Sequence, residues 1–214
     1  ATFGSAHNIA INEESGFAYI VGANVCSGGL YIVDIQDPTN PVEAGCFADD
    51  GYTHDVQCVM YSGPDTDYSG REICFAYNED TLTIVDVTDK ASPQQISRFT
   101  YSGVAYSHQG RLAKSQSFIL LDDELDEQQS GHKTKTYILS VADLDGPVLV
   151  GEFLGSTAAI DHNLYIEGDF AFQANYTAGL RILQLGDLSS VDICEVASFD
   201  VYPDSDSAIF SGAW

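Results

Sequence analysis

A nine-residue segment that occurs four times constrains the fold of this chain more than any other feature. The copies are GLYIVDIQD (29–37), TLTIVDVTD (81–89), KTYILSVAD (135–143) and GLRILQLGD (179–187). Each copy ends in an aspartate, at Asp37, Asp89, Asp143 and Asp187. A turn and another short apolar run follow each aspartate, and the first three turns contain a proline. The chain therefore repeats a structural unit rather than a lone motif.

A column of histidines precedes the repeated segment. AHNIAIN, THDVQCV, SHQGRLA and DHNLYIE carry His7, His54, His108 and His162. Between each histidine and the repeated segment lies a run such as FAYIVG or REICFAY, which is typical of a strand. Four short strands joined by turns, with almost no helical periodicity, are typical of a propeller blade.

The sequence thus predicts an all-β fold, a β-propeller of four-stranded antiparallel blades. We expect a single propeller domain over residues 1–214, with blades at roughly 1–47, 48–101, 102–155 and 156–205. Residues 206–214 would then begin a further blade. Because a blade buries one face only by stacking on its neighbours, we expect the chain to be part of a larger ring.

Five cysteines bear on the compartment, since disulfides persist in oxidising surroundings. Cys58 and Cys74 lie eight residues either side of Thr66 and would face each other in a hairpin folded there. Cys26 and Cys46 form a second plausible pair, which leaves Cys194 odd. The alternative is five reduced, buried thiols in a cytosolic protein.

The charge balance excludes some classes of partner. The chain has 32 Asp and Glu against 8 Lys and Arg, for a formal net charge of −24. Nucleic acid and anionic membranes repel such a surface, because binding to them depends on Lys and Arg. No run approaches the roughly 18 apolar residues of a membrane helix. The N-terminus does not resemble a signal peptide, so either export is absent or its signal lies upstream.

Several long motifs resemble the LVIVD-repeat β-propellers of the choice-of-anchor B family. They include GSAHNIAINEESGFAYIVG, CSGGLYIVDIQDPTNPVEAGCF, YSGPDTDYSGREI, LDDELDE and FSGAW. The resemblance implies a secreted or surface-displayed protein with more blades than this chain supplies, and it brings no known reaction. The chain departs from the family pattern at Arg111, where an aromatic residue is expected, and at Gln184, where the first two copies have Asp34 and Asp86.

The four histidines are candidate metal ligands. The first strand of a propeller blade lines the central channel, so His7, His54, His108 and His162 are expected to project toward one axis. Imidazoles gathered there could bind a transition metal or act in acid–base chemistry. Structural hydrogen bonds repeated once per blade are the favoured alternative.

Two acidic loops are candidate calcium sites. Asp65 and Asp67 stand in a D-x-D-x-x-G arrangement that could supply oxygen ligands to a hard cation. The run LDDELDEQQSG concentrates carboxylates that repel one another unless cations offset them: Asp122, Asp123, Glu124, Asp126 and Glu127. At Asp65 and Asp67 a solvated acidic turn is the alternative. The acidic run could also be a docking strip or a solvated charged loop, and the loop is the favoured interpretation. NYT at 175–177 is a glycosylation sequon with Asn175 as its acceptor.

These observations predict an extracellular or cell-surface module that binds or has a structural role and is supported by calcium or another divalent cation. Its partners would be proteins or glycans at the cell surface or further copies of itself, and neither nucleic acid nor a membrane. No nucleophile elbow or phosphate-binding loop is present, so no catalytic residue is predicted. The alternative is a metal-dependent propeller hydrolase, in which the histidines with Asp55 and Asp161 hold a channel-centred ion. A third interpretation is that the acidity is only an adaptation to high salt.

Overall fold

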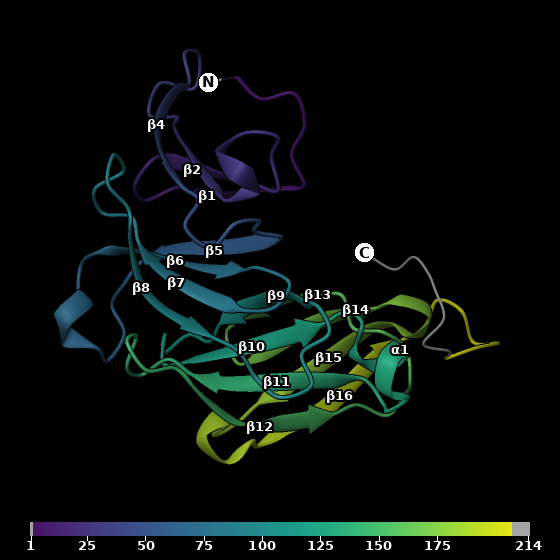
Figure 1. Cartoon of the computed structure of the whole chain (residues 1–214). Coiled ribbons are helices and arrows are strands. Elements are labelled where there is room, and N and C mark those ends of the chain that lie inside the picture. Colours follow the sequence, from purple (N-terminus) through teal and green to yellow (C-terminus); the bar gives the residue numbers. More distant parts are fainter. Residues whose placement is uncertain (1, 207–214) are drawn as a thin grey trace. The chain divides into compact units, whose positions relative to one another are not determined.

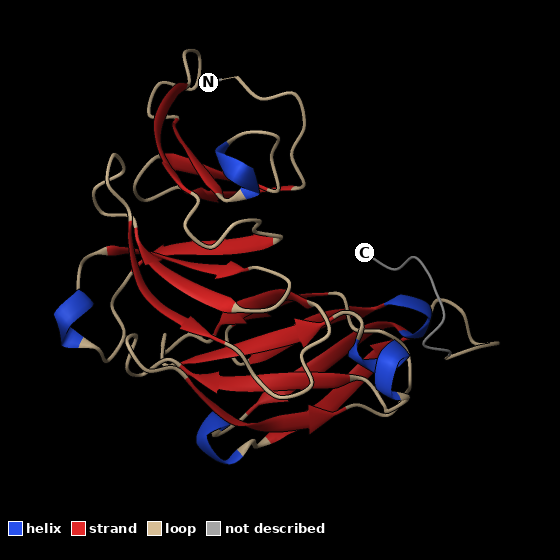
Figure 2. Ribbon diagram, in the orientation of Figure 1, coloured by secondary structure: helices blue, strands red, loops and turns tan. Residues whose placement is uncertain are grey.

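The computed structural model describes residues 2–206, and the regular secondary structure of this part of the chain is almost entirely β-strand (Figures 1 and 2). Its strands form four antiparallel sheets, each with its four strands in sequence order. The first two sheets contain β1 (Asn8–Asn12), β2 (Phe17–Val21), β3 (Leu30–Asp34), β4 (Val42–Phe47), β5 (Asp55–Met60), β6 (Glu72–Tyr77), β7 (Leu82–Asp86) and β8 (Gln94–Phe99).

The third and fourth sheets follow the same order. They contain β9 (Ser107–Leu112), β10 (Phe118–Asp123), β11 (Lys135–Ser140), β12 (Val148–Leu154), β13 (Asn163–Glu167), β14 (Phe170–Asn175), β15 (Gly179–Leu185) and β16 (Ile193–Phe199). Short helical turns join some strands: η1 (Cys26–Gly28), η2 (Thr66–Tyr68), α1 (Asp126–Ser130), η3 (Tyr176–Ala178) and η4 (Leu188–Ser190). All four sheets fall inside the predicted blades, whereas the further blade expected from 206–214 lies almost wholly outside the described residues.

The chain divides into two compact units. Unit 1 holds the first two sheets together with the short loop 144–146, and unit 2 holds the third and fourth sheets. Within unit 1, the first strand β1 lies beside β5, and within unit 2, β9 lies beside β13. Neighbouring first strands are the arrangement expected for adjacent propeller blades.

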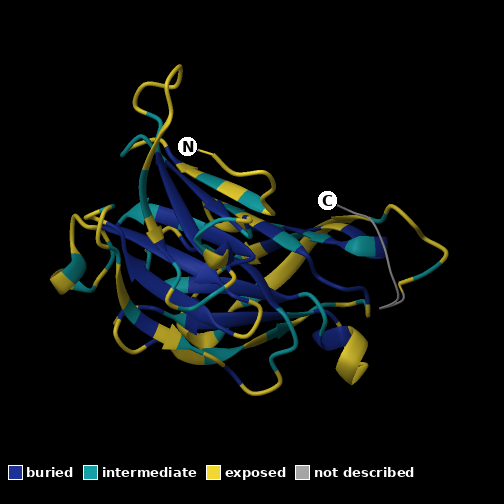
Figure 3. Ribbon diagram, turned by 45° about the horizontal axis from the view of Figure 1, so that its top comes forward, coloured by how far each residue is buried: buried dark blue, intermediate teal, exposed yellow. Residues whose placement is uncertain are grey.

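The core of each unit lies between its two sheets. In unit 1, Tyr19 and Ile32 of the first sheet pack with Val56 and Val85 of the second. In unit 2, Leu120, Ile138, Leu164 and Leu183 form the corresponding cluster. Strands β6 and β7 are buried along their whole length, and Figure 3 shows buried strand segments in dark blue. Burial on both faces explains why a repeated segment such as that of β7 reads as a continuous apolar run.

The repeated aspartates end strands and build turns. The carboxylates of Asp37 and Asp187 each accept hydrogen bonds from the backbone N–H and the hydroxyl two residues on, at Thr39 and Ser189. Asp89 accepts the N–H of Ala91 in the same way. These contacts are the turn chemistry of aspartate, and they lower the pKa of Asp37 and of Asp187.

Every sheet has a β-bulge at the same repeat position, between its third and fourth strands. The register shifts at Ile32/Val33, Ile84/Val85, Ile138/Leu139 and Ile182/Leu183. Opposite the first residue of each pair stands a small residue, at Gly45, Ser97, Gly151 and Ala197. A bulge bends its strand and increases the local twist, so this feature shapes all four sheets alike.

Two of these small residues touch the neighbouring sheet. A Cβ placed on Gly45 would overlap the carbonyl oxygen of Lys90, in the β7–β8 turn. A Cβ on Gly151 would lie 2.8 Å from a methyl carbon of Val191, just after η4 in the β15–β16 connection. In both units a glycine therefore lets the next sheet approach closely.

We expect Gly45→Ala to lower the stability of the protein, because the backbone of Lys90 must move to admit the methyl group. The expected loss is about 1–3 kcal/mol, as for other overpacked sites. Ala197→Val is the matched control: Ala197 occupies the same repeat position but is exposed, so its effect should stay within about 0.5 kcal/mol. Equal melting temperatures for wild type and Gly45→Ala would show that the close contact with Lys90 does not limit the size of the side chain at this position.

Candidate metal centre

The candidate site lies in unit 2, at the end of its two sheets where β9 and β13 begin and β10 ends. Strand β9 places His108 here, and the loop before β13 supplies Asp161 and His162. The other residues come from the end of β10 and from the longer connection to β11 that contains α1: Asp122, Glu124, Asp126 and Glu127.

Alignment of the four sheets by strand register shows what distinguishes unit 2. Asp122 takes the place of Val21, Tyr77 and Ala174 in the other sheets. Asp161 directly precedes the repeated histidine, where the other sheets have Ala6, Thr53 and Ser107. Two positions that are apolar, small or uncharged elsewhere thus carry carboxylates. Both side chains are fully buried, at 0% exposed.

The acidic run was expected as a solvated loop, and this interpretation is wrong for most of its residues. Asp122 and Asp123 are the last residues of strand β10, and Asp126 and Glu127 begin helix α1. All four are at most 1% exposed. The physical reason is that the connection folds back over the end of the sheet, where Tyr137 donates its hydroxyl to Asp126 and the Lys135 backbone N–H binds Glu127.

Asp122, Asp126, Glu127 and Asp161, here called the buried carboxylate group, lack hydrogen-bond donors for much of their acceptor capacity. Gln173 donates to one oxygen of Asp122 at 3.0 Å, and Tyr137 donates to one oxygen of Asp126 at 2.8 Å. The second oxygens of Asp122, Asp126 and Glu127 are buried without a hydrogen-bond partner, as are both oxygens of Asp161. These five buried carboxylate oxygens receive no donor from outside the group, and a protonated member can donate only to another carboxyl of the group, as between Asp161 and Asp122. Burial of such groups is costly in a protein interior, most of all when they are ionised.

Burial and mutual repulsion raise the pKa of every member of this group. Burial raises the pKa of Asp122 to about 7, and burial together with the charge of Asp126 raises the pKa of Glu127 to about 9. Burial also raises the pKa of Asp126. The pKa of Asp161 rises well above its ordinary value, through burial first and then through the charge of Asp122. Without a compensating cation, this group retains protons at neutral pH.

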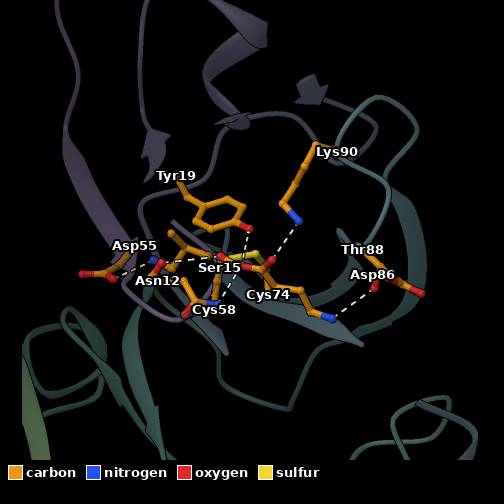
Figure 4. Close-up of a disulfide and its surroundings, with 11 residues drawn as sticks. Asn12, Ser15, Tyr19, Asp55, Cys58, Cys74, Asp86, Thr88 and Lys90 are labelled. Atoms are coloured by element: carbon orange, nitrogen blue, oxygen red, sulfur yellow. Dashed lines mark hydrogen bonds and ion pairs between the residues drawn. A yellow bond between two sulfur atoms is a disulfide. The ribbon is translucent and has the colours of Figure 1, made fainter. Parts of the chain in front are cut away.

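A buried carboxylate in unit 1 shows the opposite behaviour. Glu72, 2% exposed, accepts hydrogen bonds from Asn12, Ser15 and Tyr19 and pairs with Lys90 at 2.7 Å. Figure 4 shows Asn12, Ser15, Tyr19 and Lys90 converging beside the Cys58–Cys74 disulfide. Burial by itself would raise the pKa of Glu72, but the Lys90 ammonium and the hydroxyl donors outweigh it, so the pKa is lowered. The pKa of Glu72 is thus lowered, and those of the buried carboxylate group are raised, because of the hydrogen-bond donors around each carboxylate rather than because of burial alone.

Next to the buried carboxylate group, two histidines face one glutamate. His108 Nε2 lies 3.7 Å from one carboxylate oxygen of Glu124, and His162 Nε2 lies 3.7 Å from the other. The two imidazole centroids are 4.3 Å apart, and the Tyr176 hydroxyl donates to Glu124. The ligand atoms of His108, Glu124 and His162 all lie within 4.8 Å of one another.

The remaining predicted ligands have other surroundings. His7 and His54 form a ring pair in unit 1, with centroids 4.0 Å apart. Asp65 caps η2 by accepting the N–H of Asp67, which is exposed. Asp123 accepts hydrogen bonds from Tyr101 and from the backbone N–H groups of residues 105 and 106, so it holds that loop in place.

The cysteines pair as the spacing indicated, whereas the sequon is buried. Disulfides join Cys26 to Cys46 and Cys58 to Cys74, and Cys194 is free and exposed. Asn175 is only 3% exposed, so this conformation disfavours a glycan on its amide. Two disulfides fit a protein outside the cytoplasm. In residues 2–206, no helix has the length and apolar character needed to cross a membrane.

Comparison with known proteins supports the fold and the repeat. A family model described as the LVIVD repeat matches residues 3–49 and 69–100. The chain has a β-propeller fold, and the LVIVD repeat matches residues in its first two sheets. No curated protein gives a significant match to the chain. Solved propellers resemble it in fold, including the β-propeller domain of Cps50 (Swd1) from Myceliophteria thermophila, at a TM-score of 0.50 and 14% identity over 86% of this chain and 57% of that one.

Two bacterial structures are similar over more of this propeller. A protein from Lactobacillus plantarum gives a TM-score of 0.68 at 14% identity, covering 95% of this chain and 58% of that chain. The periplasmic gluconolactonase PpgL of Pseudomonas aeruginosa gives 0.60 at 12% identity, covering 92% and 54%. The chain thus spans little more than half the length of these proteins, and identities this low establish the fold alone.

We expect the stability of the cation-free protein to fall as pH rises from about 4 to about 9. In the folded state the buried carboxylate group keeps its protons at these pH values. In the unfolded chain the same carboxyls have their ordinary pKa near 4 and have lost them. Unfolding therefore releases protons, and higher pH favours unfolding. Between pH 5 and pH 8 in chelator, the melting temperature should drop by at least about 5 °C.

Asp161→Ser is the control for this prediction. Serine is the residue of the third sheet at this position, Ser107, and it removes both unsatisfied oxygens of Asp161. The variant should show a clearly flatter pH profile. If wild type and variant lose stability in parallel, the pH dependence comes from the overall negative charge instead.

Proposed function

We propose that this propeller is a secreted or surface-displayed binding module without catalytic activity, whose second unit is stabilised by a divalent cation, with calcium as the best fit. The observation that carries the proposal is the set of five buried oxygens on Asp122, Asp126, Glu127 and Asp161 that receive no donor from outside this group. A polar group that is buried without a partner is rare in native proteins, and a bound ion is one of the ordinary ways in which such a group is satisfied.

The donor chemistry favours calcium. Calcium takes six to eight oxygen ligands in flexible geometry, and carboxylates bind it through one or both oxygens. Four carboxylates within mutual electrostatic reach supply enough oxygens, and two positive charges offset much of their repulsion. Magnesium fits less well, because it holds several waters in strict octahedral geometry, which a closely buried site accommodates poorly.

Burial of the ligands supports a structural rather than a catalytic cation. A catalytic metal keeps a coordination position open to substrate, whereas structural sites are closed by protein ligands. Asp122, Glu127 and Asp161 are 0% exposed, so an ion among them would have little access to substrate. This argues against the hydrolase alternative at this group.

The proposed location outside the cytoplasm and the proposed family are supported by other features of the chain. The two disulfides favour an oxidising compartment, and the charge of −24 keeps such a protein soluble. The LVIVD repeats and the long motifs named above support assignment to the choice-of-anchor B family. Partners at the cell surface would be proteins or glycans, or further copies of this chain.

Calcium added to the chelator-treated protein should raise its melting temperature, saturating at one ion per chain. Asp161→Ser should be more stable than wild type in chelator, because an unsatisfied buried carboxyl is gone, and should lose most of the calcium response. This opposite effect on the two forms distinguishes a cation ligand from a residue that merely supports the fold. Thermal unfolding and calorimetric titration measure both effects.

Asp86→Asn is the matched control in unit 1. Asp86 is also buried, but it already pairs with Arg71 at 2.7 Å and accepts the N–H of Thr88. The variant should be less stable with and without calcium and should keep the full calcium response. The proposal fails if calcium leaves wild-type stability unchanged, or if Asp161→Ser responds to calcium as wild type does.

A further inference from the structure

His108, Glu124 and His162 form a compact group that the calcium proposal does not use. His108 is 3% exposed and His162 is 9% exposed, while the side chain of Glu124 is 18% exposed. The group is therefore nearly buried but open to solvent on the glutamate side. Its two histidines come from the two neighbouring sheets of unit 2, and their rings are tilted by 38°.

The distances in this group suit a shared metal ion better than hydrogen bonds. Each Nε2 lies 3.7 Å from a different oxygen of Glu124, which exceeds the usual limit of about 3.2 Å for such hydrogen bonds. Two ligand atoms bound at about 2.0–2.2 Å to one tetrahedral metal lie roughly 3.4 Å apart. Small side-chain adjustments would therefore bring both nitrogens and a carboxylate oxygen into coordination.

We propose that His108, His162 and Glu124 bind a transition metal ion of the zinc class. Imidazole nitrogens select such metals over calcium, which prefers oxygen ligands alone. Three protein ligands leave the fourth tetrahedral position to water or an external ligand. Tyr176 donates its hydroxyl to Glu124 and stacks on His162, with ring centroids 5.1 Å apart, so it orients two of the three ligands.

Unit 1 contains an internal comparison. His7 and His54 pair at nearly the same ring distance, 4.0 Å against 4.3 Å. By strand register, however, the position of Glu124 in the first sheet is Ala23. Among the described residues, no group of three metal-ligating side chains includes this first pair. At the same position the second sheet has Glu79, but among the described residues only the histidine pair of unit 2 stands in such a group of three with a carboxylate.

The test is a titration of the full chain with Co²⁺, whose visible absorption bands report tetrahedral coordination. The protein carries Cys194→Ser, which removes a free, exposed thiol that also binds such metals. Excess calcium is present so that the buried carboxylate group is occupied. We expect tetrahedral bands that saturate at one Co²⁺ per chain and disappear when Zn²⁺ displaces it.

His162→Asn and Glu124→Gln should each weaken Co²⁺ binding by at least about 100-fold, and Tyr176→Phe by about 10–100-fold, as for a residue that orients a ligand. His54→Asn makes the same chemical change in unit 1 and should leave the bands and the affinity unchanged. Because Tyr176→Phe removes only a hydroxyl, it gives a result even if a ligand variant does not fold.

Absence of tetrahedral bands would overturn the proposal, as would bands that persist in both His162→Asn and Glu124→Gln or disappear in His54→Asn. The outcome is separate from the calcium proposal, because the calcium-induced rise in melting temperature should be unchanged in His162→Asn. Failure of the calcium response in wild type, with normal Co²⁺ binding, would leave this site standing.

Discussion

Within each unit the two sheets bury apolar side chains against one another, and the shared features of the repeat serve that packing. The core clusters of both units lie between two sheets. The β-bulge recurs at one repeat position in all four sheets. Beside it, Gly45 and Gly151 admit a turn of the neighbouring sheet. The apolar strands, the bulge and the small residue thus all serve the close packing of two neighbouring sheets.

The sequence predicted this scaffold well because repetition reveals it directly. Strand spacing gave the four blades, and distances along the chain gave both disulfides, which the structure contains. The bulge could not be predicted, because the affected residues, such as Ile32 and Val33, look like any strand interior. The four histidines were expected on one axis; within each unit the structure brings them together as a pair.

The candidate site was predicted only in part, because acidic residues ordinarily indicate exposure. Asp122 and Asp126 were proposed as ligands, but their burial was not expected, and Asp161 entered only through the hydrolase alternative. A usable signal existed nonetheless. Asp122 interrupts a column that holds Val21, Tyr77 and Ala174, and Asp161 interrupts a column of small, uncharged residues. Departures from a repeat mark the positions that packing alone does not explain.

One acidic run supplies carboxylates to several environments because backbone geometry changes along it. At the end of β10 the register with β9 shifts between Asp122 and Asp123; Asp122 accepts a hydrogen bond from Gln173 in the neighbouring sheet, and Asp123 accepts the backbone N–H groups of the preceding loop. Beyond the strand, Glu124 lies between two imidazoles, and α1 buries Asp126 and Glu127. Asp123 receives donors from the chain and needs no ion. The other carboxylates of this run are the same kind of group as Asp123 but have different neighbours. The nearest hydrogen-bond donors therefore decide whether a carboxylate here supports the fold or is available to a metal.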